Sequence, residues 1–245
     1  MLHPARLMDL SIVIPVRNEQ PNIAPLVAEI RAALDGKLDY EVVYIDDGSS
    51  DGTGDEVKRV AREFPRLRLV RHATNCGQSA AIRTGVKAAR APWIATLDGD
   101  GQNDPADIPA LWERARGHGG AATLIAGWRH KRRDTWIKRA SSKVANVVRA
   151  RLLGDATPDT GCGLKLFRRD LFLDLPYFDH MHRFLPALVL RAGGRTEIVP
   201  VNHRPRERGK SNYGTLDRLA VGITDLVGVM WLKRRARLPA VVKDE

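Results

Sequence analysis

The chain has 245 residues, 43% of them hydrophobic, which suits one large α/β domain that buries a core of its own. Its 40 Lys and Arg residues outnumber its 29 Asp and Glu residues, and the net charge of +11 favours an anionic partner such as nucleic acid, a membrane surface or a phosphorylated substrate. The N-terminus lacks the apolar segment of a signal peptide and no run of about 18 apolar residues is present, so we expect neither secretion nor a transmembrane helix.

Apolar runs alternate with helical segments over the first hundred residues. The runs predict buried strands at 10–16, 40–45, 67–71 and 93–97, and the segments between them predict helices that end near 34 and 64 and a third over 76–90. Ser49, Ser50 or Asp51 can cap the second helix. Strands that alternate with helices indicate an α/β fold with a mostly parallel central sheet flanked by helices. We interpret Cys76 and Cys162 as buried thiols, because they are far apart and lack ligand spacing.

Acidic residues follow three of these strands. Val16–Glu19, Asp46–Asp47 and Asp98–Asp100 each lie where a strand is expected to end. Because ligands of parallel sheets bind outside the carboxyl ends of the strands, we expect the three segments to meet in one crevice. No G-x-G-x-x-G motif follows the first strand, which disfavours a Rossmann dehydrogenase.

Asp98 and Asp100 belong to the segment LDGDGQNDP, which covers 97–105. Side chains two residues apart in an extended segment point the same way, so both carboxylates can face one hard divalent cation such as Mg²⁺ or Mn²⁺. Such a cation completes its coordination with phosphate oxygens, and a diphosphate is therefore the expected ligand. The alternative is a simple turn after the strand, since Asp and Gly both favour turns.

The pattern of helices and strands continues beyond Asp104. Expected helices run from there to about 116, over 135–153 and over 182–191, and expected strands cover 121–126, 164–167 and 195–201. A basic loop fills 127–134. The helix over 135–153 has one apolar and one cationic side, so it packs on the sheet or lies in a membrane interface.

Two polar loops carry further candidate residues. The Gly-rich loop 154–163 contains Asp159, which is either a catalytic carboxylate or a turn former. The segment 203–214 holds four cations in seven residues, with Ser and Tyr hydroxyls nearby. Guanidinium, ammonium and hydroxyl groups suit a phosphate, and a solvated basic loop is the alternative.

The C-terminal segment 216–232 is apolar almost all round and is followed by the basic run 233–237. At about 1.5 Å per residue, its uninterrupted part is too short to cross roughly 30 Å of hydrocarbon. We expect it to lie on an anionic lipid surface or to pack on a partner, and a helix buried against the domain is the alternative.

Six segments together resemble glycosyltransferase family 2, in the branch of dolichol-phosphate mannose synthase and the bacterial polyprenyl-phosphate glycosyltransferases. They occur in the family's order between Ile12 and Tyr213: IVIPVRNEQPNI, VVYIDDGSSDGT, NCGQSAAIRTG, TLDGDGQNDP, PDTGCGLKLFRRD and RERGKSNYG. The resemblance implies a GT-A catalytic domain over 1–214. The remaining 215–245 would form an amphipathic helix and basic tail at a membrane interface.

The resemblance also implies roles for individual residues. The residues expected to bind the donor are Pro15, Val16, Glu19, Asp46, Asp47, Asp98, Gly99, Ser211 and Tyr213. Asp98 and Asp100 match the D-x-D motif that holds Mg²⁺ or Mn²⁺, with Gln102 as a further metal-side residue. The candidate catalytic residues are Asp100, Asp159 near the reacting sugar, and Arg206 in the phosphate-gripping loop. The family usually has apolar residues where Gly99 and Gly101 stand, and often Lys in place of Asn212.

The activity implied is inverting transfer of a sugar from a UDP- or GDP-sugar to a polyprenyl phosphate such as undecaprenyl or dolichyl phosphate. A phosphate monoester has a second pKa near 6 and is mostly dianionic at neutral pH, so it scarcely needs a base. We therefore expect Asp159 to orient the sugar more than to accept a proton. Arg206, Lys210 and the cations of 128–133 are expected to hold the lipid phosphate.

These expectations place the chain in the cytoplasm, peripherally bound to the inner face of the cell membrane or to a separate small membrane protein, and they leave a homo-oligomer open. Three alternatives remain. One is a family 2 enzyme that acts on a saccharide acceptor in cell-envelope polysaccharide synthesis, and another is a non-catalytic nucleotide-sugar binder. The third, a nucleic-acid-binding protein, is disfavoured because the sequence carries no nucleic-acid-binding motif.

Overall fold

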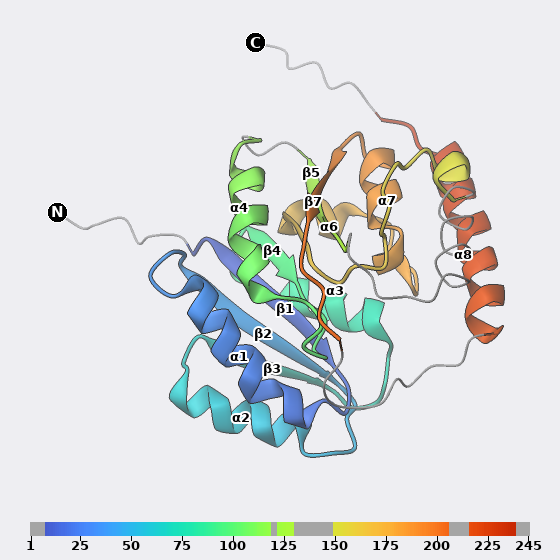
Figure 1. The fold of residues 1–245 in the computed structure, drawn as a ribbon. Helices are drawn as coiled ribbons and strands as arrows, with labels where there is room; N and C mark the ends of the chain where they lie inside the picture. The colour runs from blue at the N-terminus through green and yellow to red at the C-terminus, as the bar shows by residue number, and fades with distance from the viewer. Residues whose placement is uncertain (1–7, 119–121, 130–148, 206–215, 239–245) are drawn as a thin grey trace, which may run out of the picture.

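The computed structural model describes residues 8–118, 122–129, 149–205 and 216–238, with side chains from 222 onward in the last range. Within these residues, seven strands form one sheet in the order β3-β2-β1-β4-β6-β5-β7 (Figure 1). Only β6 runs antiparallel to its neighbours, β4 and β5, so the expected mostly parallel sheet is confirmed. The strands are β1 (Leu10–Val16), β2 (Tyr40–Asp47), β3 (Leu67–His72), β4 (Trp93–Thr96), β5 (Thr123–Trp128), β6 (Lys165–Arg168) and β7 (Arg195–Pro200).

Helices cover both faces of this sheet (Figure 1). The α-helices are α1 (Gln20–Leu34), α2 (Thr53–Glu63), α3 (Gln78–Ala88), α4 (Ile108–Arg116), α6 (Arg169–Asp174), α7 (Leu185–Arg191) and α8 (Leu216–Arg234). Short 3₁₀ helices, η1 (Pro105–Asp107) and η2 (Met181–Arg183), precede α4 and α7. The helix α6 lies in a segment for which the sequence pattern gave no prediction.

Two apolar layers result, because side chains of a strand alternate between the faces. Ile12 and Ile14 of β1 pack with α1, α2 and α4, whereas Val13 packs on the other face with α3, α6 and α7. Val42 and Tyr44 of β2 likewise join the first layer. A sheet covered on both faces explains why the central strands are continuous apolar runs rather than alternating ones.

Three local predictions were wrong. The helix α2 begins at Thr53 with Gly52 as its N-cap, so none of the three predicted caps holds that position. Instead, Asp51 accepts hydrogen bonds from the Thr53 backbone N–H and hydroxyl. The helix α3 begins at Gln78 and not at Cys76, because Gly77 takes a φ of 88° that interrupts helical geometry. The thiol of Cys76 is consequently exposed, and only that of Cys162 is buried as predicted.

The C-terminal helix α8 packs against the domain along one side. Val229 is buried, and the Leu232 carbonyl accepts a 2.9 Å hydrogen bond from Arg191 of α7. Ile223, Val227 and Trp231, spaced four residues apart, are 57%, 60% and 58% exposed. No helix of the described residues is long and apolar enough to cross a membrane. Of the helix predicted over 135–153, only the last turn lies among the described residues.

Candidate functional site

The loops after β1 and β2 are tied to each other. Asn18 has a φ of 57°, its backbone N–H donates to the Ser49 hydroxyl at 3.0 Å, and its side-chain oxygen accepts from the Ser50 N–H at 2.9 Å. The next residue, Glu19, donates its N–H to the Thr53 hydroxyl at 2.9 Å. These bonds bring Glu19 to the loop that follows Asp46 and Asp47, as the sequence analysis expected.

Asp46 and Asp47 are both buried, and both are engaged by the protein. Asp46 accepts from the Ser49 N–H at 2.9 Å and pairs with Arg71 at 3.0 Å. Asp47 accepts from the backbone N–H groups of Cys76 at 2.8 Å and Gly77 at 2.9 Å. Asp46 therefore ties its own loop to β3, and Asp47 holds the chain between β3 and α3 against the end of β2.

Asp98 and Asp100 follow β4 in a different environment. Burial and the nearby charge of Asp100 raise the pKa of Asp98 to about 6. The Asp98 carboxylate accepts a 3.0 Å hydrogen bond from the side chain of Gln78, and its backbone N–H donates to Asn103 at 3.0 Å. Since Gly77 binds Asp47 and Gln78 binds Asp98, the start of α3 joins the ends of β2 and β4.

Two glycines make room for this pair. A Cβ on Gly99 would lie 2.3 Å from Cγ1 of Val16, so the chain needs glycine where the family usually has a larger residue. A Cβ on Gly163 would lie 2.2 Å from Oδ2 of Asp98. The Gly163 carbonyl accepts a 2.6 Å hydrogen bond from Thr96, which fixes the Gly-rich loop beside Asp98.

Gln102 links the loop after Asp100 to the segment after β7. Its backbone carbonyl accepts from the Arg204 N–H at 3.0 Å, and its side-chain amide donates to the Arg204 carbonyl at 3.3 Å. Arg204 also forms a bidentate ion pair with Glu29 at 3.1 and 2.6 Å. A small cavity lined by Asp100, Gly101 and Pro205 lies at this junction. The chain therefore passes close to Asp100 just before the predicted phosphate-gripping loop.

Asp159 is buried and held by Arg129. The guanidinium donates to both carboxylate oxygens at 2.7 Å, and the Arg129 backbone N–H donates to one of them at 3.3 Å. A carboxylate with both oxygens in a bidentate pair is a weak proton acceptor. This arrangement supports orientation of a substrate rather than general-base action.

A cavity beside Asp98 is lined by residues that the sequence analysis missed. Lys165 and His182 line it together with Asp98 and Pro15. Lys165 is buried, and burial lowers its pKa, while the charges of Asp98 and Asp159 act in the opposite direction. His182 bonds to the Ser79 hydroxyl at 2.7 Å, and burial lowers its pKa well below the usual value. Lys165 could have been found from the sequence, because it interrupts the apolar run of β6. A buried cation needs a nearby anion, so a lysine in a buried strand predicts an acidic group beside it.

The structure thus brings most of the predicted site residues together, and the others lie outside the residues that it describes. The residues that lie around the ends of β1, β2 and β4 and in the adjoining Gly-rich loop are Pro15, Val16, Glu19, Asp46, Asp47, Asp98, Gly99, Asp100, Gln102 and Asp159. Arg206, Lys210, Ser211, Asn212 and Tyr213 lie outside the described residues, as do 130–133 of the basic loop.

The donor set at Asp98 and Asp100 fits a divalent cation. Two adjacent carboxylates, one with its pKa raised by burial and by the other's charge, form a site that a cation would stabilise. Oxygen ligands of this kind suit Mg²⁺ or Mn²⁺ rather than a softer metal.

Known proteins resemble this chain in sequence and in fold. Residues 11–175 match the model of "Glycosyl transferase family 2". The chain is 36% identical to dodecaprenyl-phosphate galacturonate synthase of Rhizobium johnstonii over 241 residues, which is 96% of this chain and 70% of that protein. It is also 36% identical to the undecaprenyl-phosphate 4-deoxy-4-formamido-L-arabinose transferase of Edwardsiella ictaluri, over 84% of this chain and 63% of that protein.

Among solved structures, the fold resembles glucosyl-3-phosphoglycerate synthase from Mycobacterium tuberculosis in complex with Mg²⁺ and uridine diphosphate. The TM-score is 0.69 at 20% identity, and the match covers 92% of this chain and 79% of that one. The predicted GT-A architecture is thereby confirmed, whereas the roles of single residues stay predictions.

Proposed function

Since the chain belongs to glycosyltransferase family 2, we propose that it transfers a sugar from a nucleotide diphosphate to a polyprenyl phosphate, with inversion at the anomeric carbon. The observation that carries this proposal is the carboxylate pair Asp98 and Asp100, which follows β4 and whose charges interact. Asp98 lines a cavity that also contains Lys165, and Asp100 lines a second, smaller cavity beside Arg204. The two relatives named above, both prenyl-phosphate sugar transferases by name, support the choice of acceptor.

Asp98 and Asp100 would hold the divalent cation, and Gln102 lies next to them in the same loop. When bound, Mg²⁺ or Mn²⁺ acts as a Lewis acid that neutralises charge on a departing diphosphate. Gly163 and Gln78 fix the Asp98 carboxylate for this purpose, the first by leaving it space and the second by a hydrogen bond. Asp47 and Glu19 lie at the neighbouring strand ends, where the proposed nucleoside pocket begins.

Asp159 and Arg129 would act on the sugar side of the cavity. With both carboxylate oxygens held by Arg129, Asp159 positions hydroxyl groups of the sugar or favours positive charge at the anomeric carbon. The nucleophile needs no strong base, because a phosphate monoester is already largely dianionic at neutral pH. Arg206, Lys210, Ser211 and Tyr213 remain the residues proposed to hold the acceptor phosphate. Their segment begins next to Arg204, which is bonded to Gln102.

The helix α8 provides the proposed contact with the membrane. Ile223, Val227 and Trp231 project from the side of α8 that is not packed on the domain, and Arg234 and Arg235 follow them. Apolar side chains flanked by cations suit the surface of an anionic bilayer, where each cation contributes on the order of 1 kcal/mol. The proposed enzyme is therefore peripheral on the inner face of the cell membrane, with its acceptor in the same surface.

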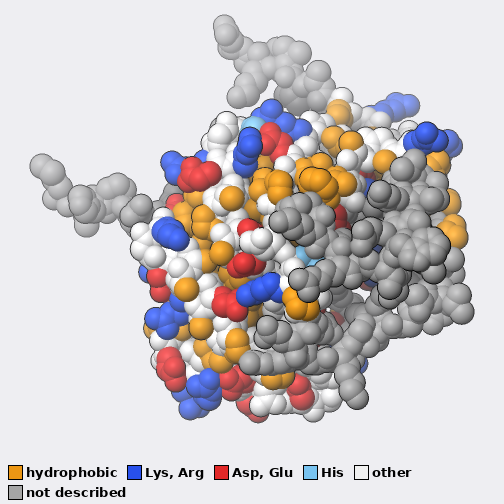
Figure 2. All heavy atoms as spheres, viewed as in Figure 1, with side chains coloured by type: hydrophobic (Ala, Val, Ile, Leu, Met, Phe, Trp, Pro, Cys, Tyr) orange, Lys and Arg blue, Asp and Glu red, His pale blue; other side chains and the backbone are white. Residues whose placement is uncertain are grey.

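On the face shown in Figure 2, acidic and basic side chains are interspersed over α1 and α2. Ion pairs such as Arg59 with Glu56 at 2.8 Å account for this mixture. A nucleic-acid-binding surface would instead gather cations along one face. This part of the surface thus gives no support to nucleic acid as the partner.

The test is transfer by the purified chain in the presence of Mn²⁺. UDP- and GDP-sugars would be incubated with undecaprenyl phosphate, and the lipid product would be identified by mass spectrometry. We expect a glycosyl phospholipid with one donor class, and no product after chelation by EDTA. Transfer only to a saccharide acceptor would instead establish the alternative family 2 activity. Donor binding without any transfer would leave a nucleotide-sugar binder and overturn the proposal.

Membrane binding is tested separately by flotation with anionic liposomes. The variant I223S/V227S/W231S alters side chains that are exposed, so we expect it to fold and to remain at the bottom of the gradient. Liposomes of neutral lipid are the matched control for the cationic contribution. Flotation of the triple variant at the level of the native chain would place the membrane contact elsewhere.

A further inference from the structure

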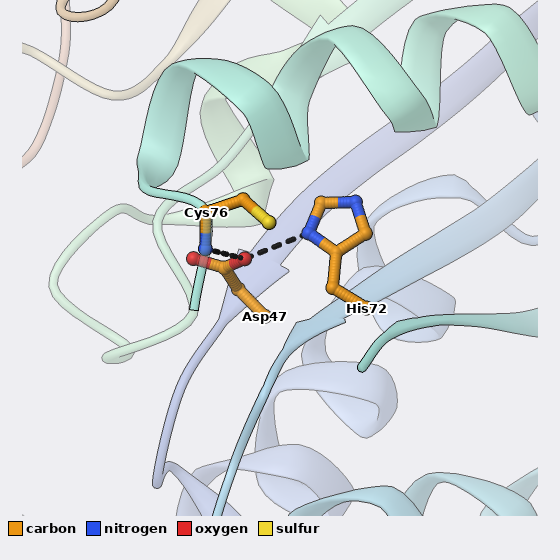
Figure 3. Close-up of side chains that lie close together, drawn as sticks. All are labelled: Asp47, His72 and Cys76. Atoms are coloured by element: carbon orange, nitrogen blue, oxygen red, sulfur yellow. Dashed lines mark hydrogen bonds and ion pairs between the residues drawn. The ribbon is translucent and has the colours of Figure 1, made fainter. Parts of the chain in front are cut away.

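Three potential metal ligands of different chemistry meet at the end of β2. Asp47 ends β2, His72 ends β3 directly beside it in the sheet, and Cys76 lies in the loop that leads to α3. Figure 3 shows the Cys76 thiol and the His72 ring on the same side of the Asp47 carboxylate. One ligand atom from each residue lies within 4.8 Å of the other two. The pairing of two neighbouring strands and one short loop thus creates the cluster.

The His72 ring is held at both nitrogen atoms. Nδ1 lies 2.7 Å from Oδ1 of Asp47, and Nε2 lies 2.9 Å from the Thr84 hydroxyl of α3. A hydrogen bond to the nitrogen that does not bind a metal is the usual way in which proteins orient a histidine ligand. Thr84 therefore fixes the ring with Nδ1 towards Asp47, where a cation would bind. The same contacts disfavour a thiol–imidazole nucleophile, because each ring nitrogen already has an oxygen partner.

The carboxylate of Asp47 also positions Cys76. Its two oxygens accept hydrogen bonds from the backbone N–H groups of Cys76 and Gly77. Each carboxylate oxygen has two lone pairs, so Oδ1 can bind a cation in place of His72 while it keeps the bond from Cys76. The backbone that carries the thiol is thus fixed before any metal arrives, which lowers the entropic cost of assembling the ligands.

The ligand set matches a borderline-soft cation. Thiolate, imidazole and carboxylate are all common ligands of Zn²⁺, whereas Mg²⁺ prefers oxygen alone. Bonds of about 2.0–2.3 Å in a tetrahedral site place ligand atoms roughly 3.3–3.7 Å apart. The 2.7 Å contact between Asp47 and His72 would open by under about 1 Å to admit the ion. Cys76 is exposed, so water can supply the fourth ligand.

We propose that Asp47, His72 and Cys76 form a Zn²⁺ site, with three protein ligands and an open position for water. The site shares Asp47 with the proposed nucleoside pocket and is distinct from the oxygen-only pair at Asp98 and Asp100. The helix α3 begins between the two, with Gly77 bonded to Asp47 and Gln78 to Asp98. The oxygen ligands at Asp98 and Asp100 would therefore favour the hard cation, and the mixed ligands at Asp47 would favour Zn²⁺. The proposal goes beyond the transfer reaction, and its test does not use that reaction.

The experiment titrates the metal-free full chain with Co²⁺ and then with Zn²⁺. Cobalt bound to a thiolate absorbs in the near ultraviolet, so the native chain is expected to develop this band at one equivalent and to lose it when Zn²⁺ displaces Co²⁺. The variant C76S should lose the band and weaken Zn²⁺ binding by roughly 100-fold, and H72Q should weaken binding similarly. T84V removes only the partner of Nε2 and should weaken binding about 10-fold.

Two variants serve as matched controls. C162A removes the other thiol, which is buried, and D98N alters the proposed Mg²⁺ site, so both should keep the band and the Zn²⁺ affinity. Cys76 is exposed, and thermal unfolding without metal should show that C76S folds like the native chain. Equal Zn²⁺ affinity in C76S and the native chain would overturn the proposal. Loss of the band in C162A or D98N would do the same.

Discussion

Asp47 and Asp98 lie at the carboxyl ends of two strands of the same sheet, yet their carboxylates are held in different ways. Asp47 accepts backbone hydrogen bonds on both oxygens. Asp98 accepts from the Gln78 side chain and lies near the negative charge of Asp100, and with burial this raises its pKa to about 6. The Asp47 carboxylate thus organises a loop through backbone hydrogen bonds, whereas burial and a neighbouring charge destabilise the ionised Asp98 carboxylate, which a cation would stabilise. An acidic residue after a buried strand can serve either purpose.

Loss of the Asp98 charge should act mainly on catalysis. Asp98→Asn should lower kcat by about 10³-fold, because a bound cation stabilises a leaving group by several kcal/mol. The fold should persist, since no backbone N–H of the described residues donates to the Asp98 carboxylate. Initial rates at saturating donor, acceptor and Mn²⁺ measure this effect. Asp55→Asn on α2, where the side chain is 84% exposed, is the control and should keep the native rate.

Asp47→Ala should mainly lower the stability of the fold, whereas Asp98→Asn should mainly lower the rate. It removes the acceptor of two backbone N–H groups, and hydrogen bonds to a charged group are worth about 1.5–3 kcal/mol each, of which loop relaxation recovers part. We therefore expect the free energy of unfolding to fall by about 2–3 kcal/mol in metal-free buffer, measured with urea. Unchanged stability together with lost donor binding would show that Asp47 serves the donor rather than the loop, and the contrast with Asp98 would not hold.

The sequence revealed this edge of the sheet well. Continuous apolar runs predicted β1 to β4, and the fixed geometry of parallel strands then implied that Asp47, Asp98 and Asp100 share one edge. The groups that donate hydrogen bonds to Asp47 and Asp98 could not be predicted from the sequence. The hydrogen-bond donors are Cys76 and Gly77 for Asp47 and Gln78 for Asp98, and these contacts join segments 20 to 30 residues apart.

Glycine positions show the same limit. The departure at Gly99 from the usual family pattern was visible in the sequence, but its reason, the position of Val16, required coordinates. Gly77 was predicted inside a helix, and its positive φ instead starts α3 two residues later than expected and leaves Cys76 exposed. The prediction of a buried thiol failed there because a single backbone angle decides which way the loop turns.

Gly163→Ala tests the position of the Asp98 carboxylate, because it moves this group without removing its charge. The added methyl group would meet Asp98 Oδ2 at 2.2 Å, so the carboxylate must shift. A misplacement of about 1 Å costs up to roughly 100-fold in rate, and we expect a loss of 10- to 100-fold. Gly222→Ala is the matched control, since nothing lies within 4 Å of the added Cβ. It should keep the native rate and gain up to about 1 kcal/mol of stability, since alanine favours the helix. A native rate in Gly163→Ala would show that the position of Asp98 is not critical.

A weaker effect is expected on the way in which Asp98 makes the stability of the fold depend on pH. The pKa of Asp98 is about 6 in the folded chain, above its ordinary value of 3.8, so the metal-free folded state holds this proton more tightly than the unfolded state does. Ionisation of Asp98 therefore destabilises the fold as the pH rises from about 4 to 6, and the loss stays constant above that range.

Asparagine does not ionise, so Asp98→Asn does not lose stability in this way. The free energy of unfolding of Asp98→Asn, relative to that of the native chain, should therefore rise over the same pH range. Water screens part of the cost because Asp98 is not fully buried, so we expect a gain on the order of 1–2 kcal/mol above pH 6. Urea unfolding in EDTA between pH 4 and 8 measures the difference between the two proteins. Saturating Mn²⁺ should reverse it, because the cation stabilises the ionised native carboxylate. A difference that does not change with pH would mean that folding does not raise the pKa of Asp98, and the proposed contrast between the two strand ends would then disappear.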